Sequence, residues 1–108
     1  MRAFKTGATR DGDDSKLDYE GFLSPLVLER YAQYMHLHRV QSDGQLRTSD
    51  NWQRGIELDS YMKSAWRHFM DWWSRHRRGV ADQDAMCALL FNVMGYLHEA
   101  LKSGGSDA

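Results

Sequence analysis

The stretch "AMCALLFNVMGYLHEALK", residues 85–102, carries the strongest apolar periodicity in the chain. Its apolar side chains recur at spacings of three and four residues: Met86, Leu89, Leu90, Val93, Met94, Leu97 and Leu101. This spacing places them on one side of an α-helix, whereas a strand would need alternation with period two. The stretch therefore predicts a helix, the most buried of the fold, and an all-α fold class.

Two further helices are predicted before it. Ser24 is placed as an N-cap and Pro25 as a first helical residue, so one helix should run from residue 25 to about 39. Its core positions would be Leu28, Tyr31, Ala32 and Met35. The other helix should run from 58 to about 77, with Gly79 beyond its end as a C-cap. Its apolar stripe comprises Leu58, Met62, Ala65, Trp66, Phe69, Trp72 and Trp73.

A chain of 108 residues fits one domain. We expect a flexible N-terminal arm over 1–18, a single all-α domain over 19–102 and a flexible tail over 103–108. No segment alternates well enough to predict a strand. Residues 40–56 form a long, turn-rich connection, and loops of this length are often functional. Three helices are few for a self-contained bundle, so the sequence predicts that oligomerisation completes it, as in a dimer that pools helices.

Composition limits the classes of function. The 14 Lys and Arg against 15 Asp and Glu leave a net charge of −1, so no global field attracts nucleic acid. The cluster "RHRR" at 75–78 is explained by the dipole at a helix C-terminus. No apolar run reaches the roughly 20 residues that span a bilayer, and none resembles a secretory signal. With a single cysteine, Cys87, we expect a cytoplasmic protein without a membrane role.

The metal chemistry that the sequence permits is oxygen-based. One cysteine excludes thiolate clusters, and His36 and His38 are only two residues apart, which is poor spacing for zinc on a helix. Mg²⁺ can be held by one or two carboxylates together with substrate phosphates. The helical candidates are Glu29, Asp71 and Asp84, although isolated acids on helices are usually solvated.

Phosphate recognition has no standard motif here, because neither a P-loop nor a Rossmann glycine pattern occurs. Lys63 and Arg67 lie four residues apart and could present charge to one anion. Arg67 could equally form an exposed ion pair with Asp71, and His68 could be a half-buried structural histidine.

Five segments carry a resemblance: "KLD" (16–18), "SPLVLERYA" (24–32), "DNWQRGI" (50–56), "YMKSAWRHFMDWW" (61–73) and "ALLFNVMGYL" (88–97). In this order and spacing, over residues 16–101, the chain resembles the dATP/dGTP diphosphohydrolase family of the N-terminal-domain type, which consists of small, mainly phage-encoded proteins. The resemblance implies a relationship to the MazG-like nucleoside triphosphate pyrophosphohydrolases. Those all-α dimers or tetramers use helix-borne carboxylates and Mg²⁺ to cleave between the α and β phosphates.

The resemblance also implies roles for single residues. The metal ligands would be Glu29, Asp84 and, as a third, Asp71. The catalytic and phosphate-contacting residues would be His68, Arg67 and Lys63. The nucleotide-binding residues would be Lys16, Asn51, Trp52 and Asn92. The chain departs from the MazG-like pattern at Ala88, where those enzymes have a metal-binding aspartate.

The function implied is a Mg²⁺- or Mn²⁺-dependent pyrophosphohydrolase that converts a purine dNTP to its monophosphate and pyrophosphate, in the host cytoplasm if phage-encoded. A non-catalytic nucleotide-binding module on the same scaffold is the alternative that the missing carboxylate at Ala88 favours. A partner-binding helical protein is the third possibility.

Overall fold

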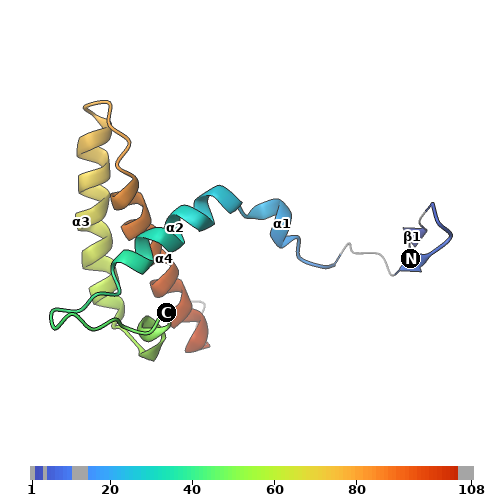
Figure 1. Cartoon of the computed structure of the whole chain (residues 1–108), viewed down its shortest axis with the longest axis horizontal. Coiled ribbons are helices and arrows are strands. Elements are labelled where there is room, and N and C mark those ends of the chain that lie inside the picture. Colours follow the sequence, from blue (N-terminus) through green and yellow to red (C-terminus); the bar gives the residue numbers. More distant parts are fainter. Residues whose placement is uncertain (1, 4, 11–14, 105–108) are drawn as a thin grey trace.

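The computed structural model describes residues 2–3, 5–10 and 15–104, and helices dominate it (Figure 1). The order of elements is β1 (Arg2–Ala3), β2 (Thr9–Arg10), α1 (Tyr19–Phe22), α2 (Pro25–Leu37), the 3₁₀ turn η1 (Asn51–Arg54), α3 (Leu58–His76) and α4 (Gln83–Lys102). The predicted all-α class is confirmed. The expectation of no strand is wrong for the antiparallel pair β1–β2, because two-residue strands are too short to produce an alternating pattern.

Local signals at the helix ends match those in the sequence. The Ser24 hydroxyl accepts a hydrogen bond from the Val27 amide at 3.3 Å, and Pro25 is the first residue of α2. Beyond α3, Gly79 has a φ of +79°, the left-handed conformation that favours glycine. Its amide donates to the carbonyl of His76 at 2.9 Å, so the chain turns sharply there into the segment before α4.

The core lies between α3 and α4, which are joined by this short turn and pack side by side (Figure 1). Tyr61 of α3 is the largest fully buried side chain, and it lies against Gly95 of α4. Because Gly95 has no side chain, the aromatic ring fills the space that a Cβ would occupy. Buried Ala85, Cys87 and Ala88 extend the small-residue surface of α4. This helix has the most buried residues of those described, as predicted.

Helix α2 packs against α4 through Tyr31 and Arg30. Tyr31 is half-buried. Burial raises its pKa to about 12, and the nearby Cys87 of α4 is a smaller cause. Helix α1 and the strand pair β1–β2 lie away from α3 and α4 (Figure 1). The radius of gyration is accordingly 18.9 Å, whereas a compact chain of this length has about 13 Å.

The predicted apolar stripes are only partly buried, which corrects the expectation that they face a core. Met62, Trp66, Phe69 and Trp73 of α3 are exposed, and so are Val93, Met94, Leu97 and Leu101 of α4. On α2, Leu28 and Ala32 are exposed while Tyr31 and Met35 are half-buried. The physical reason is geometric, because each stripe is wider than the surface that the neighbouring helices cover.

The arm predicted over 1–18 and the tail predicted over 103–108 lie partly outside the described residues. Within the part of the chain that the structure describes, no helix is long and apolar enough to cross a membrane.

Candidate functional site

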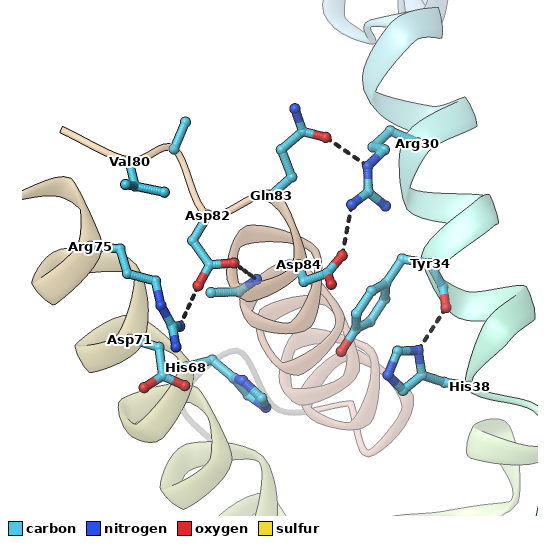
Figure 2. A pocket seen from close by; sticks show the side chains of 12 residues that line it. Arg30, Tyr34, His38, His68, Asp71, Arg75, Val80, Asp82, Gln83 and Asp84 are labelled. Carbon is cyan, nitrogen blue, oxygen red and sulfur yellow. Dashed lines mark hydrogen bonds and ion pairs between the residues drawn. The ribbon is translucent and has the colours of Figure 1, made fainter. Parts of the chain in front are cut away.

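A polar hollow of about 680 Å³ lies between α2, the second half of α3 and the start of α4. Figure 2 shows side chains from all three helices pointing toward it. Its charged and titratable lining residues are Arg30, Tyr34, His38, His68, Asp71, Arg75, Asp82 and Asp84. Basic and acidic side chains thus line the same polar hollow. Such a lining suits a ligand that carries both anionic phosphates and a metal cation.

Asp82 builds one wall of the polar hollow. Its side chain caps α4 by accepting a hydrogen bond from the Ala85 amide at 3.0 Å, and its second oxygen is ion-paired with Arg75. The hydrogen bond from Ala85, followed by the pairing with Arg75, lowers the pKa of this carboxyl below its ordinary value. Asp82 therefore holds Arg75 at the edge of the hollow and fixes the start of α4.

Arg30 joins α2 to the start of α4. Its Nη2 donates to Asp84 Oδ1 at 2.7 Å, and its Nε donates to Gln83 Oε1 at 2.8 Å (Figure 2). The hydrogen bond to Asp84 raises the pKa of the guanidinium. The Asp84 side chain is nevertheless 74% exposed, so solvent screens the pair and a phosphate can compete for Arg30.

His68 and Asp71 lie three residues apart on α3, and both line the polar hollow. Among the described residues, neither side chain forms a hydrogen bond or an ion pair with another residue. A half-buried imidazole and an exposed carboxylate are therefore both available to a ligand. They are the two sequence-predicted residues best placed to act on one.

A second, smaller and more enclosed pocket of about 220 Å³ lies beside η1. We call it the aromatic pocket; its lining residues are Met35, His38, Arg39, Arg47, Thr48, Ser49, Asn51, Trp52, Ile56 and Phe91. Trp52 meets Phe91 edge to face at 6.3 Å between ring centroids, and His98 at 4.8 Å. These contacts hold the indole in place, so a flat ligand could stack on it without disordering the loop.

His38 lines both the polar hollow and the aromatic pocket. Its Nδ1 lies 2.8 Å from the Tyr34 carbonyl oxygen, which can only accept, so Nδ1 carries the proton. Nε2 is then the acceptor in the neutral ring. Arg39 and Arg47 also line the aromatic pocket, and Arg39 Nε donates to the Arg47 carbonyl at 2.7 Å, which orders the turn-rich connection.

The sequence-predicted residues divide into those brought together and those kept apart. His68, Asp71 and Asp84 share the polar hollow, while Asn51 and Trp52 share the aromatic pocket. Five others lie elsewhere: Lys16, Glu29, Lys63, Arg67 and Asn92.

Each of these five has a different location. Glu29 lines a separate hollow on α2 with His36. Asn92 is buried and its amide donates to the Ala88 carbonyl at 2.7 Å. Lys63 and Arg67 are exposed on α3, and Lys16 lies in the segment before α1. Arg67 thus does not share the polar hollow with Asp71, and Glu29 lies apart from the other two predicted metal ligands, Asp71 and Asp84.

Sequence reasoning missed most of the lining of the two pockets, including His38, which lines both, and four arginines: Arg30, Arg39, Arg47 and Arg75. Arg30 meets its partners 53 and 54 positions away, and no local spacing signals such contacts. Arg75 was attributed to the helix dipole within "RHRR", although its partner Asp82 lies only seven residues further on.

The available ligand side chains decide whether the protein can hold a Mg²⁺ ion by itself. Residues 2–3, 5–10 and 15–104 contain no group of three or more His, Cys, Asp or Glu side chains arranged to hold a metal ion. Ala88, where the resemblance expects an aspartate, is 3% exposed and belongs to the core. The residues therefore do not fit a resident ion. Asp71 and Asp84 suit an ion that arrives with a triphosphate, because Mg²⁺ then needs only one or two carboxylates.

Comparison with protein-family models, with characterised proteins and with solved structures finds no match to this chain.

Proposed function

We propose that this protein binds a nucleoside triphosphate with its Mg²⁺ ion and hydrolyses it to the monophosphate and pyrophosphate. The observation that carries the proposal is the junction of two unlike pockets at His38, one polar and ringed by charge, the other small and aromatic. A nucleotide has the same two-part character, with a flat base at one end and metal-bound phosphates at the other. The resemblance to pyrophosphohydrolases supports the reaction.

The base would occupy the aromatic pocket. Trp52 offers a face for stacking, and Asn51 offers both a donor and an acceptor for a base edge. The volume of about 220 Å³ accommodates a base but not a whole nucleotide, so the sugar and phosphates must extend past His38. The resemblance favours a purine as the base.

The triphosphate would lie in the polar hollow. Arg30 and Arg75 would neutralise phosphate charge, while Asp71 and Asp84 would contact the Mg²⁺ ion that the substrate brings. In the reaction, a water oxygen forms a bond to the α-phosphorus and the bond from that phosphorus to the α,β-bridging oxygen breaks. His68 accepts the water proton, and pyrophosphate leaves with its metal.

The test is incubation of the protein with each dNTP and NTP and Mg²⁺ or Mn²⁺, followed by ion-exchange separation of the products. Monophosphate and pyrophosphate should form, and His68→Ala and Asp71→Asn should each reduce their rate by about 100-fold or more. Asp59→Asn is the matched control, because Asp59 is an acid of α3 that lines neither pocket. Equal hydrolysis rates in the Asp59 and Asp71 variants would show that the polar hollow is not the catalytic site.

Glu29→Ala belongs in the same assay, since Glu29 is the sequence-predicted metal ligand that lies outside both pockets. Activity that survives this change while Asp71→Asn abolishes it would place the metal contacts within the polar hollow. Activity lost in Glu29→Ala would instead assign Glu29 to the site.

A second candidate function is non-catalytic nucleotide capture. It is favoured by buried Ala88 in place of a carboxylate and by the ion pairs of Asp82 and Asp84 with arginines. This function predicts a rise in melting temperature with one nucleotide and no product with any of them.

A further inference from the structure

His38 lies where the two pockets of the proposed site meet, because it lines both the polar hollow and the aromatic pocket. It is also the C-cap of α2, and its amide donates to the Met35 carbonyl at 3.2 Å, so the helix end fixes its position. The residue is exposed, so a ligand can reach its ring. In a nucleotide that spans both pockets, the group between the base and the phosphates is the sugar, which would therefore lie beside His38.

Tyr34 holds the His38 ring by an edge and by a face. Nδ1 lies 2.8 Å from the Tyr34 carbonyl oxygen, and the two rings pack with their centroids 4.1 Å apart and 32° between their planes. Because the carbonyl only accepts, Nδ1 carries the proton and Nε2 of the neutral ring carries the lone pair. Figure 2 shows the edge of the ring opposite this carbonyl turned toward the polar hollow. The structure therefore presents a hydrogen-bond acceptor there in a fixed orientation.

An acceptor at this point distinguishes the parts of a nucleotide. Ionised phosphate oxygens only accept hydrogen bonds, so they cannot bond to the lone pair of Nε2. They match instead Arg30 and Arg75 of the polar hollow, whose side chains only donate. The base would be held by Asn51 and Trp52, which line the aromatic pocket but not the polar hollow. Between the two, the sugar hydroxyls are the donors that match Nε2 of His38.

We propose that His38 Nε2 accepts a hydrogen bond from a sugar hydroxyl of the bound nucleotide. The inference rests on the proposed function and adds a sugar subsite to it. The 2′ and 3′ hydroxyls have the same chemistry, so either one fits the contact. A nucleotide that has neither hydroxyl loses this bond, and the protein therefore binds dideoxynucleotides more weakly. His38 contacts the sugar and moves no proton in the reaction.

Calorimetric titration of the full chain at about pH 8, where free imidazole is neutral, tests the contact. The ligands are Mg²⁺ complexes of adenosine triphosphate analogues that cannot be cleaved between the α and β phosphates. One analogue has both hydroxyls, one only the 2′, one only the 3′ and one neither. We expect the wild type to bind the dideoxy analogue about 3- to 10-fold more weakly than the analogue with both hydroxyls, the range for one hydrogen bond between neutral groups. The two analogues with a single hydroxyl show which hydroxyl is bound.

His38→Phe keeps a flat ring but has no nitrogen, so this variant should bind the four analogues equally. His36→Phe is the matched control, because His36 is an exposed histidine of the same helix that lines neither pocket. It should discriminate as the wild type does. His38→Ala replaces His38→Phe if circular dichroism shows that the phenylalanine variant is misfolded.

The outcomes separate the sugar contact from the proposed function. Equal binding of all four analogues by the wild type would overturn the sugar contact and leave the base and phosphate sites in place. Discrimination that survives the loss of the His38 ring, or that His36→Phe abolishes as well, would overturn it too. A wild type that binds none of the analogues would overturn the proposed function and the sugar contact together.

Discussion

Replacement of Gly95 by alanine tests the closest approach in the fold. A Cβ at this position would overlap ring carbons Cε1 and Cζ of Tyr61 and lie 2.6 Å from its Oη. Tyr61 is 1% exposed, so its ring has no free space into which to move. In an ordinary helix, glycine to alanine gains about 1 kcal/mol. Overpacking a core costs about 1–3 kcal/mol. Because the overlap is with a rigid ring, we expect a net loss of about 1–2 kcal/mol.

Urea unfolding followed by far-UV circular dichroism measures this loss, and the melting temperature should fall by roughly 5–10 °C. The control is the same substitution in a Tyr61→Ala background, where the ring is gone and Gly95→Ala should become stabilising. Strong non-additivity between the two changes is therefore expected. A wild-type background that tolerates Gly95→Ala without loss, or two changes that simply add, would refute the account of how α3 and α4 meet.

Three further predictions concern single side chains. Tyr61→Phe should leave stability unchanged or raise it by up to about 2 kcal/mol, because Tyr61 Oη is buried with no hydrogen-bond partner among the described residues; a clear loss would reveal a partner. Asp82→Ala should cost about 1 kcal/mol at pH 7. The folded pKa of Asp82 is lowered, so its contribution is complete above about pH 4 and is lost as pH falls through the folded pKa. Wild type and variant should therefore converge in acid urea titrations, and a constant gap would contradict the cause assigned. Trp52→Ala should weaken nucleotide affinity by about 5- to 150-fold in calorimetry, the range for one lost base stack, and an unchanged affinity would remove the base from the aromatic pocket.

Local chemistry made the helix positions predictable. Ser24 and Pro25 begin α2 where expected, and Gly79 turns the chain after α3. These residues act on the backbone of their own sequence neighbours. The helix ends that they mark can therefore be predicted without knowledge of the tertiary structure. The end of α2 was predicted two residues late, near 39, because that boundary has no comparably strong signal.

Helix faces were less predictable than helix ends. The tryptophan-rich stripe of α3 was expected to form the core, yet Tyr61, a residue outside the stripe and one position before Met62, is the buried residue. The choice depends on Gly95, a residue in another helix whose missing side chain leaves room for the Tyr61 ring. A periodic pattern reports that a face is apolar but does not report which part of it a neighbour covers.

In the candidate site too, local features could be predicted from the sequence and contacts between helices could not. Asn51 and Trp52 lie in one pocket because they are adjacent in the turn-rich connection that was singled out for its length. Arg30 reaches the polar hollow only because α2 crosses the start of α4, and no spacing in the sequence predicts that crossing. Glu29, the neighbouring residue that the resemblance marks as a metal ligand, lines a different hollow.

The central claim is that one nucleotide occupies both pockets. Its most direct test is calorimetric titration with the Mg²⁺ complex of a dATP analogue that cannot be cleaved between the α and β phosphates. The wild type, Trp52→Ala, His68→Ala and an exposed α3 control, Met70→Ala, would be compared. We predict that one analogue binds per subunit and that the Trp52 and His68 changes both weaken it while Met70→Ala does not. Affinity that depends on only one pocket, or on neither, would contradict the account.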